Sequence, residues 1–85
     1  MTITEKQIKE GGHEYRFDNG CWVCLWPEDA EGGTWEFQSD ERDEETYSSG
    51  GYLLQDNAVY DYDGCVDLPL EVIMAMNDYG YNIDL

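Results

Sequence analysis

The stretch of sequence that decides the fold spans residues 13–26 and reads HEYRFDNGCWVCLW. Hydrophobic and polar residues alternate on both sides of Asn19-Gly20, the dipeptide preferred in two-residue type I′ turns of β-hairpins. A two-residue turn at this position predicts that Phe17 lies opposite Trp22. Because side chains alternate between the faces of a strand, the hairpin would be amphipathic. The expected apolar face holds Tyr15, Phe17, Trp22, Cys24 and Trp26, and the expected polar face holds Glu14, Arg16 and Asp18.

Further strands are expected on the C-terminal side of this hairpin. Residues 34–38 (TWEFQ) alternate so that both aromatic rings share one side of a strand. Residues 52–55 and 58–62 predict a second hairpin that turns at Asp56-Asn57. Residues 39–51 are rich in acids, serine and glycine, and this composition favours a loop.

Residues 2–11 predict a short N-terminal helix. Thr4 can serve as its N-cap, and Gln7 follows at the spacing of a capping box. Gly11 and Gly12 would end the helix. A helix this short is unstable alone, so it would have to dock on the rest of the protein.

A second helix is expected near the C-terminus. It would begin at Asp67 or Leu68 and end at Gly80, a residue type that commonly follows a helix. One apolar stripe along it is formed by Val72, Ile73, Met76 and Tyr79. The residues that follow predict a short edge strand in which Tyr81, Ile83 and Leu85 alternate with polar residues.

These elements place the chain in the α+β class. We expect an antiparallel sheet of four to six strands built from hairpins, with a short N-terminal helix and one C-terminal helix packed on the sheet. The chain has 85 residues, no internal repeat and no long linker. It is therefore expected to form a single acidic domain over residues 1–85.

The composition combines a high negative charge with many aromatic residues. Twenty Asp and Glu accompany only four Lys and Arg, so the formal net charge is −16. Such a charge is typical of disordered tails. Three Trp, seven Tyr and two Phe can nevertheless build a core, since each buried ring removes about 150–250 Å² from water. The sequence predicts a compact polyanion, and its natural partner is basic.

The chain also lacks the patterns of a membrane or secreted protein. No apolar run approaches the roughly 18–20 residues of a membrane span, and the first residues, MTITEK, do not resemble a signal peptide. Three cysteines are an odd number, and this disfavours a secreted disulfide framework. An acidic surface is repelled by anionic membranes and by nucleic acids. We expect a cytoplasmic protein without direct contact to either.

Signals for catalysis or metal binding are weak. Cys21 and Cys24 fall on one predicted strand, where residues three apart point to opposite faces and cannot easily form a disulfide. Cys65 is too distant to complete a usual zinc signature, and no phosphate loop or nucleophilic triad is present. The sequence predicts a non-enzyme with no cofactor, and a small zinc-binding protein is kept as an alternative. The potential zinc ligands are His13, Cys21, Cys24 and Cys65.

The acids point to a surface for a partner. Alternate positions on a strand are about 6.6–6.8 Å apart, so acids two residues apart form a row of negative charge that can stand in for a phosphate backbone. Tyr47 follows a dense run of acids and is the expected aromatic anchor, because Tyr is enriched at interfaces. The predicted partner-binding residues are Asp40, Glu41, Asp43, Glu44, Glu45, Tyr47, Asp61 and Asp63.

In length, acidity and expected α+β layout, the chain resembles the small DNA-mimic inhibitors of phages and mobile elements, which include anti-restriction and anti-CRISPR proteins. The resemblance extends over the whole chain in composition. It implies a protein that occupies the basic DNA- or RNA-binding groove of a CRISPR effector or restriction enzyme and blocks it stoichiometrically, in the bacterial host cytoplasm if a phage encodes it. The alternative is an immunity- or antitoxin-like protein that binds a basic partner outside its nucleic-acid site. A monomer and a dimer are both compatible with the sequence.

Overall fold

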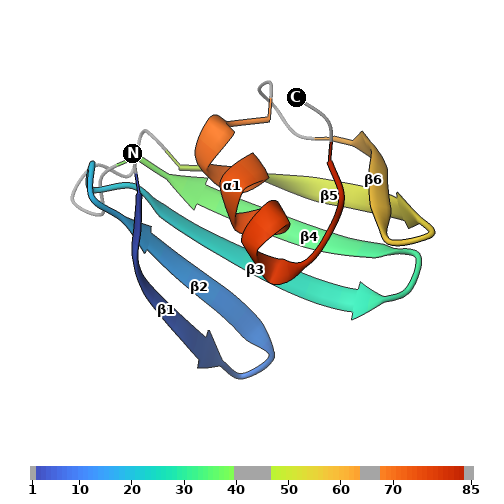
Figure 1. Ribbon diagram of the computed structural model, residues 1–85, viewed down its shortest axis with the longest axis horizontal. Helices are drawn as coiled ribbons and strands as arrows, with labels where there is room; N and C mark the ends of the chain where they lie inside the picture. Colours follow the sequence, from blue (N-terminus) through green and yellow to red (C-terminus); the bar gives the residue numbers. More distant parts are fainter. Residues whose placement is uncertain (1, 40–46, 64–67, 84–85) are drawn as a thin grey trace.

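The computed structural model describes residues 2–39, 47–63 and 68–83, which form a six-stranded antiparallel sheet and one helix (Figure 1). Each strand pairs with its neighbours in the sequence. The α+β class, the antiparallel sheet and the C-terminal helix are confirmed. The elements are β1 (Ile3–Lys9), β2 (Gly12–Phe17), β3 (Trp22–Asp29), β4 (Gly32–Gln38), β5 (Tyr47–Gln55), β6 (Ala58–Tyr62) and α1 (Leu70–Tyr79).

The N-terminal segment is a strand, so the helix expected over residues 2–11 is wrong. β1 pairs with β2 through a two-residue turn in which Glu10 and Gly11 have φ angles of 51° and 91°, as a type I′ turn requires. A helix of this length is marginal in water, whereas the strand gains a hydrogen-bonded neighbour. Gly12 lies in β2 beneath Trp26, whose ring would be 2.9 Å from a Cβ placed there.

The hairpin of β2 and β3 forms as expected, but its register is shifted by one residue. Tyr15 pairs with Val23 and not with Cys24, because the connecting loop has three residues and ends at Gly20. Gly20 has a φ of 88° and donates its N–H to the Phe17 carbonyl at 3.1 Å. A shift of one residue moves every side chain of β3 to the other face. The expected apolar face is therefore wrong: Tyr15 and Phe17 share a face with Cys21, Val23 and Leu25, while Trp22, Cys24 and Trp26 lie with Glu14 and Arg16.

The second half of the sheet follows the expected order. The strand predicted at residues 34–38 is confirmed within β4, and the second hairpin turns at Asp56-Asn57, where both residues have positive φ. β5 already begins at Tyr47, so the loop expected over residues 39–51 is wrong from Tyr47 onward. Small residues suit this part of β5, since Gly50 lies opposite the large Trp35 ring of β4.

The segment after α1 covers the outer edge of β6. The expected edge strand is reduced to a parallel bridge between Ala58 and Asn82. Asn82 accepts the N–H of Val59 at 2.7 Å and donates its own N–H to Asn57 at 2.9 Å. The chain thus returns along β6 and satisfies backbone groups that would otherwise face water.

α1 crosses one face of the sheet over β3 and β4 (Figure 1). It begins at Leu70, after Pro69, and therefore later than expected. It ends where expected, because the Gly80 N–H bonds to the Met76 carbonyl at 3.2 Å. The predicted stripe is right for Val72 and Met76, which are buried, and wrong for Tyr79, which is 37% exposed.

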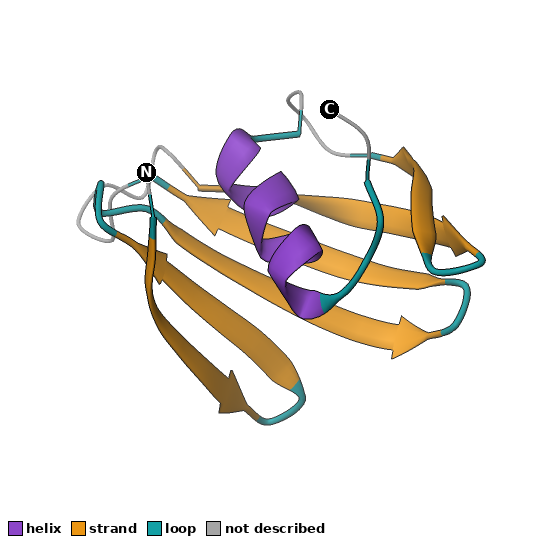
Figure 2. Cartoon of the chain, in the orientation of Figure 1, coloured by secondary structure: helices purple, strands orange, loops and turns teal. Residues whose placement is uncertain are grey.

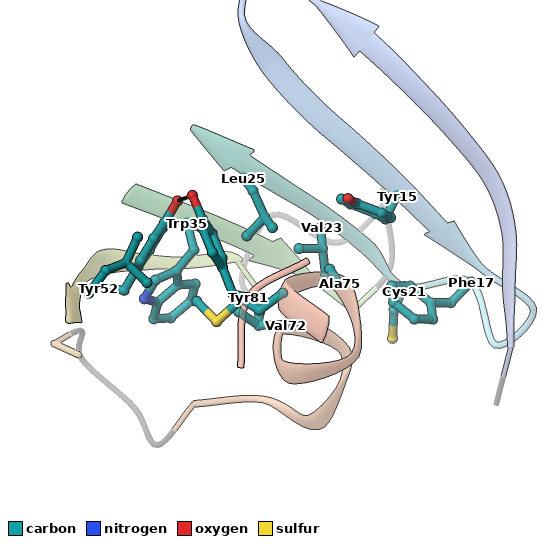
Figure 3. Close-up of a cluster of buried hydrophobic side chains, with 12 residues drawn as sticks. Tyr15, Phe17, Cys21, Val23, Leu25, Trp35, Tyr52, Val72, Ala75 and Tyr81 are labelled. Carbon is teal, nitrogen blue, oxygen red and sulfur yellow. Dashed lines mark hydrogen bonds between the residues drawn. The ribbon is translucent and has the colours of Figure 1, made fainter. Parts of the chain in front are cut away.

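The core lies between α1 and the sheet (Figure 3). Trp35 and Leu25 are fully buried at its centre. Tyr52 and Tyr81 close one side, with their hydroxyl groups 3.2 Å apart. The aromatic residues of the covered face therefore supply the burial that opposes charge repulsion.

Candidate partner-binding surface

The two faces of the sheet differ. α1 covers one face, and no helix of the described residues covers the other (Figure 2). We call the second face the open face. It presents aromatic rings beside carboxylates, a combination suited to a basic partner. Its side chains come from β1 to β5 and comprise Glu5, Gln7, Lys9, Glu14, Arg16, Trp22, Cys24, Trp26, Thr34, Glu36, Gln38, Tyr47 and Ser49.

Two carboxylates of the open face are held by aromatic hydrogen-bond donors. Glu36 accepts the indole N–H of Trp26 at 2.5 Å and the hydroxyl of Tyr47 at 2.8 Å. Glu14 accepts the indole N–H of Trp22 at 2.8 Å. These bonds fix the position of each carboxylate while its negative charge remains. The open face thus holds both charges in defined places, and the Glu14 side chain is only 11% exposed beside Lys9.

Cys24 lies between these two carboxylates, because its register partners are Glu14 on β2 and Glu36 on β4. The residue is 1% exposed. Burial raises the pKa of its thiol from 9.0 to about 12, and the charges of Glu36 and Glu14 act in the same direction. The thiol therefore stays protonated at neutral pH, which makes it a poor nucleophile and a poor metal ligand.

The potential zinc ligands are dispersed where the structure describes them. Cys24 lies on the open face, whereas Cys21 lies on the covered face with its sulfur 3.7 Å from Glu71 Oε1. His13 packs its ring edge-on against Tyr79 at the other end of α1. Cys65 lies outside the described residues. Within residues 2–39, 47–63 and 68–83, no group of three His, Cys, Asp or Glu could hold a metal ion.

The structure places three of the predicted partner-binding residues. Tyr47 is 47% exposed on the open face, bonded to Glu36. Asp61 lies in β6 and Asp63 just after it, and both are exposed. They line a cleft of about 190 Å³, where Asp63 accepts the N–H of Gly51 at 2.6 Å. The other five, Asp40, Glu41, Asp43, Glu44 and Glu45, lie outside the described residues.

Sequence reasoning missed Trp22 and Trp26 as surface residues. The expected hairpin register had placed both indole rings in the core. A competing signal was present, because Val23 and Leu25 also recur with period two along the same strand. The structure buries this aliphatic set completely and leaves the tryptophans on the open face.

The charge is segregated along the chain. Residues 1–16 hold three acids and three cations and are neutral, so the 17 acids and one cation of residues 17–85 carry the whole charge of −16. Each cation of the described part lies near an acid: Lys6 at 3.1 Å from Asp78, Lys9 at 3.6 Å from Glu14 and Arg16 at 3.7 Å from Glu5. The β1 side of the sheet is therefore balanced, and the rest is a polyanion.

One end of the sheet collects exposed acids. The turn between β3 and β4 approaches β5, where the Leu54 N–H bonds to the Glu31 carbonyl at 2.8 Å. The turn between β5 and β6 lies at the same end (Figure 1). We call this group of residues the acidic end. It comprises Glu28, Asp29, Glu31 and Asp56, all of them exposed.

Comparisons with protein-family models, with curated proteins and with solved structures found no match. Within the described residues, no helix has the length and apolar character needed to cross a membrane. The chemistry of the surface is therefore what indicates a function.

Proposed function

We propose that this protein is a nucleic-acid mimic that inhibits a DNA- or RNA-binding protein by occupying its basic groove. The observation that carries the proposal is the segregation of charge. The whole formal charge of −16 lies on residues 17–85, most of which build a sheet and helix around one core. A polyanion on a rigid scaffold presents fixed charges to a groove lined with Lys and Arg, as a nucleic acid does.

The positions of individual acids support this proposal. Asp61 in β6 and Asp63 just after it stand two residues apart, a spacing of about 6.6–6.8 Å in extended chain. On the open face, Glu36 is fixed by two donors, so little side-chain entropy is lost when a basic partner pairs with it. Association of such a surface is steered by its field and weakens as salt is added.

The proposed partner is a basic nucleic-acid-binding complex of host defence, a CRISPR effector or a restriction enzyme. Inhibition would be stoichiometric and without turnover, because a mimic acts by occupying the groove through charge and shape. Target DNA or RNA and this protein would compete for one groove.

A competition experiment tests the proposal. Guide-loaded CRISPR effectors and restriction enzymes, each with a labelled target duplex, would be titrated with the protein. We expect displacement of the duplex from one of them at a one-to-one ratio, and excess duplex should reverse it. If the protein displaces nucleic acid from none of these complexes, mimicry is contradicted. If it binds one of them alongside the duplex, the immunity-like alternative is favoured.

Matched charge reversals locate the binding surface. Asp56 and Glu10 are both exposed first residues of two-residue turns, with φ angles of 53° and 51°. Asp56→Lys should weaken binding at least about tenfold. Glu10→Lys, on the neutral β1 side, should change binding less than about twofold. Equal effects of the two variants would contradict the assignment of the surface.

The acids outside the described residues have their own test. D43K, E44K and E45K together remove the densest run of charge in the sequence. Strongly weakened binding by this variant would support the predicted site. Unchanged inhibition would confine the interface to the open face, β6 and the acidic end.

A further inference from the structure

The two outer edges of the sheet are treated differently by the chain. The β6 edge is covered, since Asn82 bonds to the backbone of Val59 and Asn57. β1 pairs only with β2, and no described residue pairs with its outer side (Figure 1). An uncovered edge strand is a template for another strand.

The register shows which backbone groups of β1 point outward. Lys9 lies opposite Gly12 across a two-residue turn and forms a hydrogen-bonded pair with it. Alternation makes Gln7 the next residue bonded to β2. The N–H and C=O groups of Lys6 and Ile8 therefore point away from the sheet. Ile8 is 71% exposed, the most exposed large apolar residue of the described part.

Charge decides what can approach this edge. A second copy of a chain with charge −16 is repelled over most of its surface. The neutral segment of residues 1–16, which contains β1, is the exception. Lys6 is engaged by Asp78 of its own chain, so it does not oppose a second strand. Lys9 lies 3.6 Å from Glu14, but its side chain is 66% exposed, which leaves it accessible to a carboxylate of a second strand.

We propose that β1 pairs with β1 of a second copy in an antiparallel register centred on Gln7, which makes the protein a dimer. This register joins the outward groups of Lys6 to those of Ile8 of the second copy. It also places Glu5 opposite Lys9 of the second copy, twice by symmetry, and such opposite charges stabilise a cross-strand pair. The exposed Ile8 side chain lies along the aliphatic stem of Lys6 of the second copy.

The dimer would be a sheet of twelve strands, six from each copy. Residues opposite each other in an antiparallel pair point to the same face. Both open faces would therefore lie on one side and both helices on the other. The inference does not depend on the proposed function, because it concerns the neutral edge and not the acidic surface.

Sedimentation equilibrium of the purified full chain tests the proposal. At about 0.5 M NaCl, where repulsion between the acidic surfaces is screened, we expect a mass of twice 9.8 kDa. At about 10 mM NaCl the dimer should dissociate at least about tenfold more readily. A monomer at every salt concentration, up to about 1 mM protein, would overturn the proposal.

A charge swap distinguishes this register from others. E5K alone and K9E alone each create two like-charge pairs between the copies and should weaken the dimer at least about tenfold. E5K combined with K9E restores opposite charges between the copies, although it disrupts the pairs with Arg16 and Glu14 within each chain. Recovery of the dimer in the double variant is expected. A double variant as weak as the singles would overturn the register.

Ile8→Pro tests the edge itself. It removes an outward N–H while leaving the Gln7 bonds to β2 in place. The expected result is a folded monomer, with folding checked by circular dichroism. A folded Ile8→Pro dimer would overturn β1 as the interface, and if this variant does not fold, the charge swap decides the question.

Discussion

The indole N–H of Trp26 donates a hydrogen bond of 2.5 Å to Glu36 across neighbouring strands of the open face. Glu36 also accepts the Tyr47 hydroxyl, so one carboxylate satisfies two aromatic donors. Replacement by Leu leaves the part-buried Trp26 indole without its acceptor, while the exposed Tyr47 hydroxyl can bond to water. We expect Glu36→Leu to lower the free energy of unfolding by about 1–3 kcal/mol. Urea denaturation followed by circular dichroism measures this loss.

Two further variants provide controls for this prediction. Glu36→Gln keeps an acceptor oxygen and removes the charge, so it should cost less stability than Glu36→Leu. In a Trp26→Phe background one donor is already gone, so Glu36→Leu should cost less there than in the native chain. Equal costs in both backgrounds would mean that the Trp26 bond contributes nothing to folding.

Two glycines should differ in their tolerance of alanine. A Cβ at Gly33 would lie 2.4 Å from the Trp26 carbonyl oxygen, and this backbone atom cannot move aside. A Cβ at Gly11 meets nothing within 4 Å, although its φ of 91° still disfavours alanine. We expect Gly11→Ala to cost about 1–2 kcal/mol and Gly33→Ala to cost more. Thermal unfolding of both variants measures the difference, and a reversed order would contradict the close approach at Gly33.

The open face shows where sequence reasoning stops. The Asn19-Gly20 dipeptide located the first hairpin, and alternation predicted its strands. The dipeptide did not decide between a two-residue and a three-residue loop, because both place Gly at a positive φ. That single residue of register decides whether Trp22 or Val23 enters the core. Packing of the β3 side chains under α1 selects between these two registers, and the residues of the hairpin alone do not determine that packing.

The N-terminal strand illustrates a second limit. Thr4 and Gln7 match a capping box, which is a local signal. The competing interaction is pairing with β2, where Gln7 lies opposite Glu14. Cross-strand pairing depends on a second strand that lies later in the chain. It can therefore override local helix signals, and the residues of the first segment alone do not reveal it. The C-terminal helix was predictable because its apolar stripe and Gly80 agree.

Alkaline pH should destabilise the fold. Burial raises the pKa of Tyr15 from 10.0 to about 12, with a contribution from Asp78, and the pKa of the Cys24 thiol from 9.0 to about 12. Burial also raises the pKa of Tyr52. The folded state holds these protons more tightly than the unfolded chain, so stability is intact below about pH 9 and is lost as pH rises towards 12.

The size of the alkaline effect can be checked group by group. At pH 11, Tyr15 and Cys24 should each have lost about 1–3 kcal/mol of stabilisation. Cys24→Ala removes the thiol, so its free energy of unfolding should fall less steeply between pH 9 and 12 than that of the native chain. Urea midpoints across this range measure both slopes. Identical slopes would show that the Cys24 proton is not linked to folding.

Salt should stabilise the isolated protein, which is the opposite of its expected effect on partner binding. Like charges repel one another in a compact chain with a net charge of −16. At about 0.01 M salt the Debye length is about 30 Å, so dissolved ions screen this repulsion only weakly. Raising NaCl to about 0.15 M shortens this length to about 8 Å, so the melting temperature should rise.

Asp56→Asn with Glu31→Gln removes two charges from the acidic end and should reduce the rise, whereas Glu10→Gln, on the balanced β1 side, should reduce it less. Melting curves at both salt concentrations compare the variants. A melting temperature that falls with salt would mean that attractive pairs such as Lys6 with Asp78 outweigh the repulsion among the acids.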